Sequence, residues 1–126
     1  MARYEHLPIY KSVYDINLYF FRLAKGFSKE YKYGLATEIE GLLTGLLDKV
    51  IEANNEENKA DTLKEGMVII ERIKFKARLL HDLKAMNIKS YKFFFEKLIE
   101  ISKQFEKWRS WSQSHRTDCR AEYGSQ

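Results

Sequence analysis

The sequence has few of the residues that tight turns and cross-links require. Its 126 residues include one proline, six glycines and one cysteine. So little proline and glycine argues against an all-β fold, which needs many short turns. Cys119 has no partner for an intramolecular disulfide or a cysteine metal cluster, and a lone thiol is typical of a reducing compartment. We therefore expect a cytoplasmic protein.

Long uncharged segments are also missing. No run approaches the roughly 18 apolar residues that indicate a membrane span. The first residues carry charges at Arg3, Glu5 and Lys11 where a signal peptide would have an apolar core. We therefore expect a soluble protein that has no contact with a membrane.

Residues typical of catalytic sites are equally sparse. A di-iron bundle needs Glu-x-x-His pairs, but Arg78 stands three residues before His81, and Arg3 stands three before His6. Glycine-rich phosphate loops and serine-hydrolase elbows are absent as well. The sequence thus predicts a protein that is not an enzyme and that holds no metal and no cofactor.

Apolar residues recur at spacings of three and four, the period of an amphipathic helix. This pattern predicts four helices, from Pro8 to about Gly26, over Tyr31–Asn54, over Asn58–Met86, and through Tyr91 to about Ser112. Helices of similar length joined by short links must alternate in direction. We expect one domain over residues 1–113, an all-α antiparallel up-and-down four-helix bundle, followed by a flexible tail over 114–126.

The helices carry more apolar residues than one interior can take. Phe93, Phe94 and Phe95 are consecutive. Successive helical positions lie about 100° apart, so at least one of the three must point away from the core. Large exposed apolar patches usually mark interfaces. We therefore expect self-association, and partial burial by neighbouring loops is the alternative.

Three glycines in the second predicted helix follow a helical spacing. Gly34, Gly41 and Gly45 lie seven and four residues apart, near one line along that helix. An interior glycine costs roughly 1 kcal/mol relative to alanine, so three of them suggest a use. We expect close helix approach there, within or between subunits.

Charge is distributed unevenly along the chain. Residues 1–71 hold 9 Lys and Arg against 12 Asp and Glu, whereas residues 72–109 hold 11 against 4. Such a basic segment attracts polyanions or an acidic protein surface. Alternatively, its cations form an ordinary solvated face by pairing with nearby acidic residues, namely Glu65, Glu71, Asp82, Glu96, Glu100 and Glu106.

The third predicted helix provides the candidate nucleic-acid contacts, which are Arg72, Lys74, Arg78, His81 and Lys84. The last four follow one another at spacings of four, three and three, which predicts one cationic stripe. Phosphate contacts require positive charge and reach but no strict stereochemistry. Binding should therefore depend on salt and tolerate many sequences.

Several segments resemble a known family. They are LPIYKSVYDINLYFFRL, EYKYGLATEI, VIEANNEENK, RLLHDLKAMNIKSY and FEKWRSW, spread over residues 4–111. They are similar to accessory variability determinants, the four-helix-bundle accessory proteins of diversity-generating retroelements. Related proteins are encoded in intervening sequences of bacterial 23S ribosomal RNA genes. The combination of KYGLATEI, ANN and LLHDLK favours the retroelement branch.

The resemblance implies a barrel-shaped homopentamer with a basic surface. Such a protein binds nucleic acid, including template RNA, and the reverse transcriptase of its element, which copies that RNA with errors at adenines. By matching segment, Arg78, His81 and Lys84 in RLLHDLK and Lys32 in EYKYG would contribute to the basic surface. The other branch implies a structural module whose basic helices dock an acidic protein.

Overall fold

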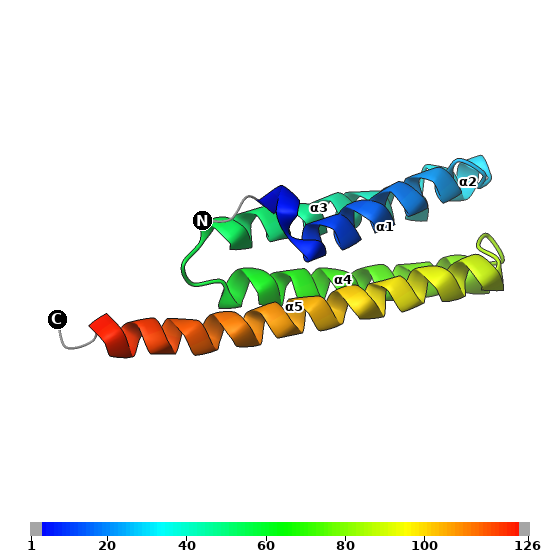
Figure 1. The fold of residues 1–126 in the computed structure, drawn as a ribbon. Coiled ribbons are helices and arrows are strands. Elements are labelled where there is room, and N and C mark those ends of the chain that lie inside the picture. Colours follow the sequence, from blue (N-terminus) through cyan, green and yellow to red (C-terminus); the bar gives the residue numbers. More distant parts are fainter. Residues whose placement is uncertain (1–3, 124–126) are drawn as a thin grey trace.

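The computed structural model describes the backbone of residues 4–123 and the side chains of residues 4–114. Within these residues it contains helices and no strand. The four long helices are α1 (Pro8–Ala24), α3 (Leu35–Asn55), α4 (Ala60–Asp82) and α5 (Ile88–Tyr123), and they run alternately up and down (Figure 1). Two short helices, η1 (Tyr4–His6) and α2 (Lys29–Lys32), precede α1 and α3. The predicted four-helix bundle is confirmed.

The bundle has two layers and two distinct ends. One layer pairs α1 with α3 and the other pairs α4 with α5, as Figure 1 shows. The helix α2 and the turn between α4 and α5 lie at one end of the molecule. The start of α1 and the link between α3 and α4 lie at the other end, and α5 extends beyond them.

Each long helix contributes one apolar stripe to a single core. The fully buried large side chains are Phe20 on α1, Ile39, Leu43 and Leu46 on α3, Leu63, Ile70, Ile73 and Leu80 on α4, Met86 in the α4–α5 turn, and Phe94, Leu98 and Phe105 on α5. Their spacing of three, four and seven is the one that the sequence predicts. On α3 the stripe centres on Leu43, whereas its neighbour Leu42 is only partly buried.

The second predicted helix is interrupted near its start. Tyr31 belongs to the one-turn helix α2, and α3 begins only at Leu35. Between them, Gly34 leaves helical geometry with φ −114° and ψ −109°. A Cβ atom at Gly34 would lie 2.8 Å from the Glu30 carbonyl oxygen, so this turn requires glycine. Gly34 therefore marks a turn, not a close approach between helices.

The third predicted helix ends earlier than its apolar period suggests. Its last residue is Asp82, not Met86, because Lys84 adopts a left-handed conformation with φ 65°. The backbone N–H groups of Ala85 and Met86 both donate to the Leu80 carbonyl oxygen, at 2.8 and 3.1 Å. Such bonds use the carbonyl groups that a helix end leaves unpaired.

The fourth predicted helix continues past its expected end. Ser112 is the last buried residue among the described side chains, and the backbone of α5 is helical through Tyr123. The predicted flexible tail comprises residues 114–126, and the side chains from residue 115 on lie outside the described part of the chain. It stays a prediction.

The buried amide of Asn17 joins α1 to α3. The Nδ2 atom of Asn17 donates to the carbonyl oxygen of Val13 on its own helix at 2.9 Å and to that of Leu43 at 3.0 Å. Leaving a buried polar group without its hydrogen-bond partners lowers the stability of the fold by about 1–3 kcal/mol. Asn17 therefore favours one axial register of α1 against α3.

The close-approach glycine of this fold is Gly66 on α4. A Cβ atom there would lie 2.6 Å from Cε1 of the fully buried Phe105 ring on α5. By contrast, a Cβ atom at Gly41 or Gly45 would meet nothing within 4 Å. The predicted close approach at Gly41 and Gly45 is therefore wrong within the subunit, and the version between subunits stays a prediction.

Replacing Gly66 with alanine is expected to destabilise the bundle by about 1–3 kcal/mol, because the added methyl group enters the volume of the Phe105 ring. Gly41→Ala is the matched control, since it makes the same change in open space. There the better helix propensity should stabilise the protein by about 0.5–1 kcal/mol. Urea denaturation followed by circular dichroism measures both. Shifts of the same sign for the two variants would contradict the assignment.

Candidate nucleic-acid interface

The predicted cations on α4 do not form one open stripe. The Lys74 side chain is only 20% exposed, and its ammonium group lies 3.5 Å from a carboxylate oxygen of Glu71 and 5.6 Å from the centre of the Phe95 ring. Arg78 is exposed and pairs with Asp82 one turn later, at 3.6 Å. Lys84 is exposed but lies beyond the end of α4, so helical spacing does not align it with the others.

His81 supports the turn between α4 and α5. Its ring stacks on that of Tyr91, with centroids 4.9 Å apart and planes 7° from parallel. Its Nδ1 atom lies 3.1 Å from the Met86 carbonyl oxygen, at hydrogen-bond distance. The half-buried ring thus connects the last turn of α4 to the first turn of α5. A role for His81 in phosphate contact stays a prediction.

Arg72 lies in a different environment from the other candidates. It lines a shallow hollow between α3 and α4 together with Gly41, Leu42 and Phe75. Arg72 is exposed, and so is Phe75, whose side chain is 54% accessible. This part of α4 is therefore a mixed apolar and basic face.

The alternative of a solvated, internally paired face is correct for part of the basic segment. Besides the Lys74–Glu71 and Arg78–Asp82 pairs, Lys97 pairs with Glu100 at 3.4 Å. Lys76 reaches across to Glu38 on α3, at 2.8 Å. These four cations have acidic partners within the subunit, so the cations without an ion pair in the described residues lie at other positions.

Positive charge collects at the end of the bundle that carries α2 and the α4–α5 turn (Figure 1). Residues 22–33 and 83–92 hold seven Lys and Arg but one acidic residue, Glu30. We call these seven cations the basic end, and they are Arg22, Lys25, Lys29, Lys32, Lys84, Lys89 and Lys92. Four of them come from the first half of the chain, whose overall charge is acidic.

The cations of the basic end are available to a partner. Within the described residues, no ion pair involves any of the seven. All are exposed except Lys32, which is partly buried. Burial raises the pKa of the neighbouring Glu40, and the positive charge of Lys32 opposes that rise. The basic end therefore presents unneutralised charge to solvent.

Two of the three lysines at the opposite end, Lys49 and Lys59, are bound by groups of the protein itself. Lys49 bridges Glu65 and Glu52, at 2.7 and 3.1 Å. Its hydrogen bond to Glu65, followed by the one to Glu52, raises the pKa of the Lys49 ammonium group. The Lys59 ammonium group donates to the carbonyl oxygens of Ala53 and Glu56 at the end of α3, and burial lowers its pKa. This end, which residues 48–65 form, offers six acidic residues and three lysines.

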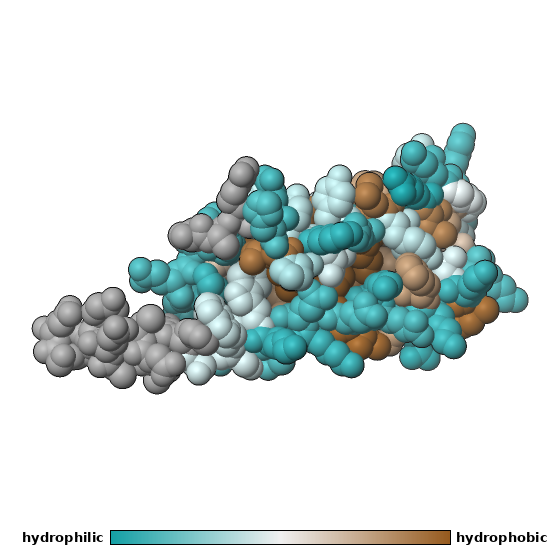
Figure 2. Space-filling model, in the orientation of Figure 1, coloured by the Kyte–Doolittle hydropathy of each residue, from teal (hydrophilic) through white to brown (hydrophobic). Residues whose placement is uncertain are grey.

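Apolar side chains also reach the surface. Phe94 is buried whereas Phe93 is 44% exposed, so the prediction that one of three consecutive phenylalanines points outward is confirmed. On α4, Val68, Phe75 and Leu79 form an exposed stripe at helical spacing. Figure 2 shows apolar residues between the two layers and at the end of the α4–α5 turn, surrounded by hydrophilic ones.

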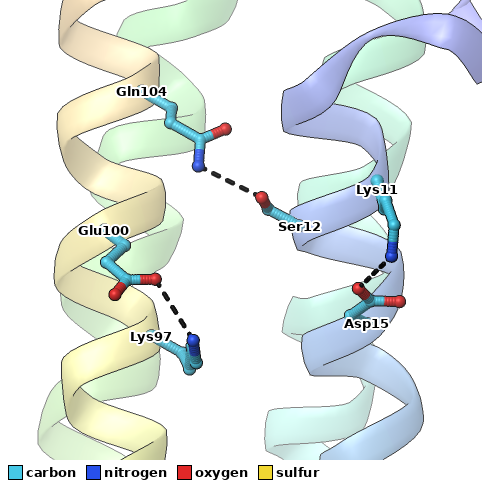
Figure 3. A network of polar contacts seen from close by, with 6 residues as sticks. All are labelled: Lys11, Ser12, Asp15, Lys97, Glu100 and Gln104. Carbon is cyan, nitrogen blue, oxygen red and sulfur yellow. Dashed lines mark hydrogen bonds and ion pairs between the residues drawn. The ribbon is translucent and has the colours of Figure 1, made fainter.

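A groove of about 280 Å³ separates α1 from α5. Its polar lining is paired mainly within each helix, as Figure 3 shows, through Lys11–Asp15 on α1 and Lys97–Glu100 on α5. Two hydrogen bonds join α5 and α1 here. The Gln104 amide donates to the Ser12 hydroxyl at 3.1 Å, as Figure 3 shows, and the Tyr19 hydroxyl donates to the Ser90 carbonyl oxygen at 3.5 Å. Among the described residues, no group of three or more His, Cys, Asp and Glu is placed to hold a metal ion.

The sequence matches the bAvd-like family over residues 7–111. The chain belongs to this family. The match covers all of α1, α3 and α4 and the bundle-forming part of α5. Of the two branches that the sequence resembles, this match corresponds to the accessory variability determinants (Avd). No curated protein and no solved structure matches the chain.

The bAvd-like family consists of accessory, noncatalytic proteins that are associated with retroelements. None of the described helices combines the length and the apolar character that crossing a membrane requires.

Sequence reasoning missed part of the basic end in this bAvd-like chain. It identified Lys32 and Lys84 but not Arg22, Lys25 or Lys29, which lie in the first 71 residues, where acidic residues outnumber basic ones. The signal that was available is topological: in an antiparallel bundle, the first and third connections lie at the same end. Counting charge by connection would have found the cluster.

His81→Ala is expected to lower the free energy of unfolding by about 1–2 kcal/mol, because it removes both the stack on Tyr91 and the hydrogen bond to Met86. Arg78→Ala, in the preceding turn, removes only an exposed ion pair and should cost less than about 0.5 kcal/mol. Chemical denaturation of the two variants measures the difference. Equal losses would refute a structural role of His81 in the turn.

Proposed function

We propose that this protein is a cytoplasmic, noncatalytic accessory subunit of a diversity-generating retroelement. It binds nucleic acid, template RNA or its cDNA, and the partner reverse transcriptase, and so supports mutagenic cDNA synthesis. The observation that carries the proposal is the basic end, where seven cations lie without an ion pair inside the described part of the chain. Family membership supplies the retroelement context.

The basic end favours contact with phosphates over readout of bases. Its lysines sit on short connections and helix ends, so no helix presents a regular row of side chains to a groove. Flexible ammonium groups neutralise phosphates without fixed geometry, and binding then follows counterion release. The expected activity is sequence-tolerant binding whose affinity falls steeply with salt.

A homopentamer is part of the proposal, and the outer face of α3 and α4 supports it. Val68, Phe75 and Leu79 form the exposed stripe of α4. Of these three residues, Phe75 lines a hollow together with Gly41 of α3. At Gly41 and Gly45 the backbone is not covered by other side chains of the subunit. Such a face allows another helix to approach closely, and its apolar area is typical of a self-association surface.

Experiments must distinguish two candidate protein partners, the reverse transcriptase and an unrelated acidic protein. A basic surface attracts both kinds of partner through the same long-range field. Copurification with the reverse transcriptase of the element, and cDNA synthesis that depends on the accessory protein, support the proposal. A complex with an acidic protein that survives nuclease treatment, in a protein that binds no nucleic acid at low salt, would replace it.

Reversing charge at the basic end is expected to weaken nucleic-acid binding. The double variant Lys84→Glu, Lys89→Glu should bind with lower affinity at low salt. The slope of log affinity against log salt should also fall by about one for each lysine removed. Fluorescence anisotropy with a labelled oligonucleotide over a salt series measures both quantities.

The control is the double variant Lys64→Glu, Lys103→Glu. It changes the net charge by the same amount at two exposed lysines outside the basic end, neither of them in an ion pair of the described residues. It should retain most of the affinity and the salt slope. Equal loss in both double variants would show that net charge, not the basic end, controls binding.

Phe75→Glu is expected to dissociate the assembly into subunits of 15.0 kDa, because a carboxylate would be buried in an apolar contact. Leu18→Glu is the control, since Leu18 is an exposed apolar residue of α1 with 37% accessibility and lies outside the stripe. Multi-angle light scattering reports the mass of each variant. An unchanged oligomer in Phe75→Glu would exclude this face as the interface.

A further inference from the structure

Tyr33, directly after α2, is the most exposed large apolar or aromatic side chain in the described part of the chain. Its accessibility is 72%, against 61% for Ile88 and 54% for Phe75. An aromatic ring in water forgoes the stabilisation that burial would give. This exposure within the basic end leaves the ring accessible to a partner.

The backbone beneath Tyr33 is ordered by several hydrogen bonds. The N–H group of Tyr33 donates to the Lys29 carbonyl oxygen at 3.1 Å, and the hydroxyl of Thr37 donates to the Lys32 carbonyl oxygen at 2.8 Å. The tight turn at Gly34 follows at once, with no space for a side chain beside Glu30. The ring is therefore projected from a built turn, not from a loose loop.

One cation lies near the Tyr33 ring, and a second stands one turn earlier in the sequence. The ammonium group of Lys32 lies 5.7 Å from the ring centre. Lys29 is four residues earlier on the same helical turn, which places it on the side of Tyr33. Neither lysine is in an ion pair of the described residues, and Glu30 is the single acidic residue of α2. An exposed ring beside unpaired lysines matches the chemistry of a base with its adjoining phosphates.

We propose that Tyr33 stacks on an unpaired base of a single-stranded nucleic acid while Lys29 and Lys32 contact the adjoining phosphates. This inference rests on the proposed function and makes it more specific, because phosphate contacts alone do not distinguish single strands from duplexes. Proteins that bind single strands combine a basic surface with aromatic platforms, since the face of every base can stack. In a duplex those faces are covered by neighbouring bases.

The test compares single-stranded and duplex oligonucleotides of equal length at one salt concentration. Tyr33→Ala should weaken single-strand binding by about tenfold and duplex binding by less than about twofold. Tyr33→Phe keeps the ring and should retain single-strand affinity. Tyr14→Ala is the matched control, because Tyr14 is 45% exposed on α1 and lies outside the basic end. It should leave both affinities unchanged.

The outcomes separate this inference from the proposed function. Wild-type protein that binds neither form at low salt overturns both. Salt-sensitive wild-type binding with unchanged single-strand affinity in Tyr33→Ala overturns the inference alone, as does an equal loss on both forms. If Tyr33→Ala instead abolishes capture of a protein partner and leaves both nucleic-acid affinities intact, Tyr33 is a protein contact and the inference is wrong. Thermal denaturation should show the wild-type midpoint for Tyr33→Ala and Tyr33→Phe, since the Tyr33 ring is 72% exposed.

Discussion

The interior of this bundle accommodates one apolar stripe from each long helix, and the remaining side chains are arranged around that limit. Phe94 fills the core from α5, so its neighbour Phe93 must face outward. The core is also dense enough that one glycine, Gly66, is needed to admit the Phe105 ring. Apolar residues that the interior cannot take then appear on the surface, where Val68, Phe75 and Leu79 form a stripe on α4.

Helix content and the antiparallel order could be predicted from the sequence, because a period of 3.6 residues over four segments leaves few other arrangements. The places where prediction failed are those where backbone geometry overrides the period. Gly34 interrupts a pattern that continues through it, and Lys84 ends α4 by adopting a left-handed conformation although apolar residues follow. Neither event changes hydrophobic spacing, so a pattern of side chains cannot reveal it.

The candidate site was predicted only in part, for a reason that lies in the topology. Along the sequence, positive charge belongs to the second half, and the candidates Lys74 and His81 follow from that count. In the fold, Lys74 lies against Phe95 and His81 against Tyr91, so their cationic or polar groups are partly used inside the subunit. Unpaired charge accumulates instead where the first and third connections meet, and that meeting is a property of the bundle, not of any sequence window.

The two functional surfaces proposed for this bAvd-like protein lie on different parts of the bundle, and self-association through one of them would determine how copies of the other are arranged. Self-association through the α3–α4 face uses the side of the bundle, whereas nucleic acid is proposed to bind at one end. Cyclic symmetry places equivalent parts of every subunit at the same height along the ring axis. In the proposed ring, the basic ends of all subunits, each with Tyr33 and its flanking lysines, would therefore lie on one rim. A polyanion that reaches two of them binds the second site at high effective concentration. In such a ring, modest affinity at each basic end would be enough to hold a long strand tightly. Each individual contact would still be weak enough to dissociate as a polymerase moves along the strand.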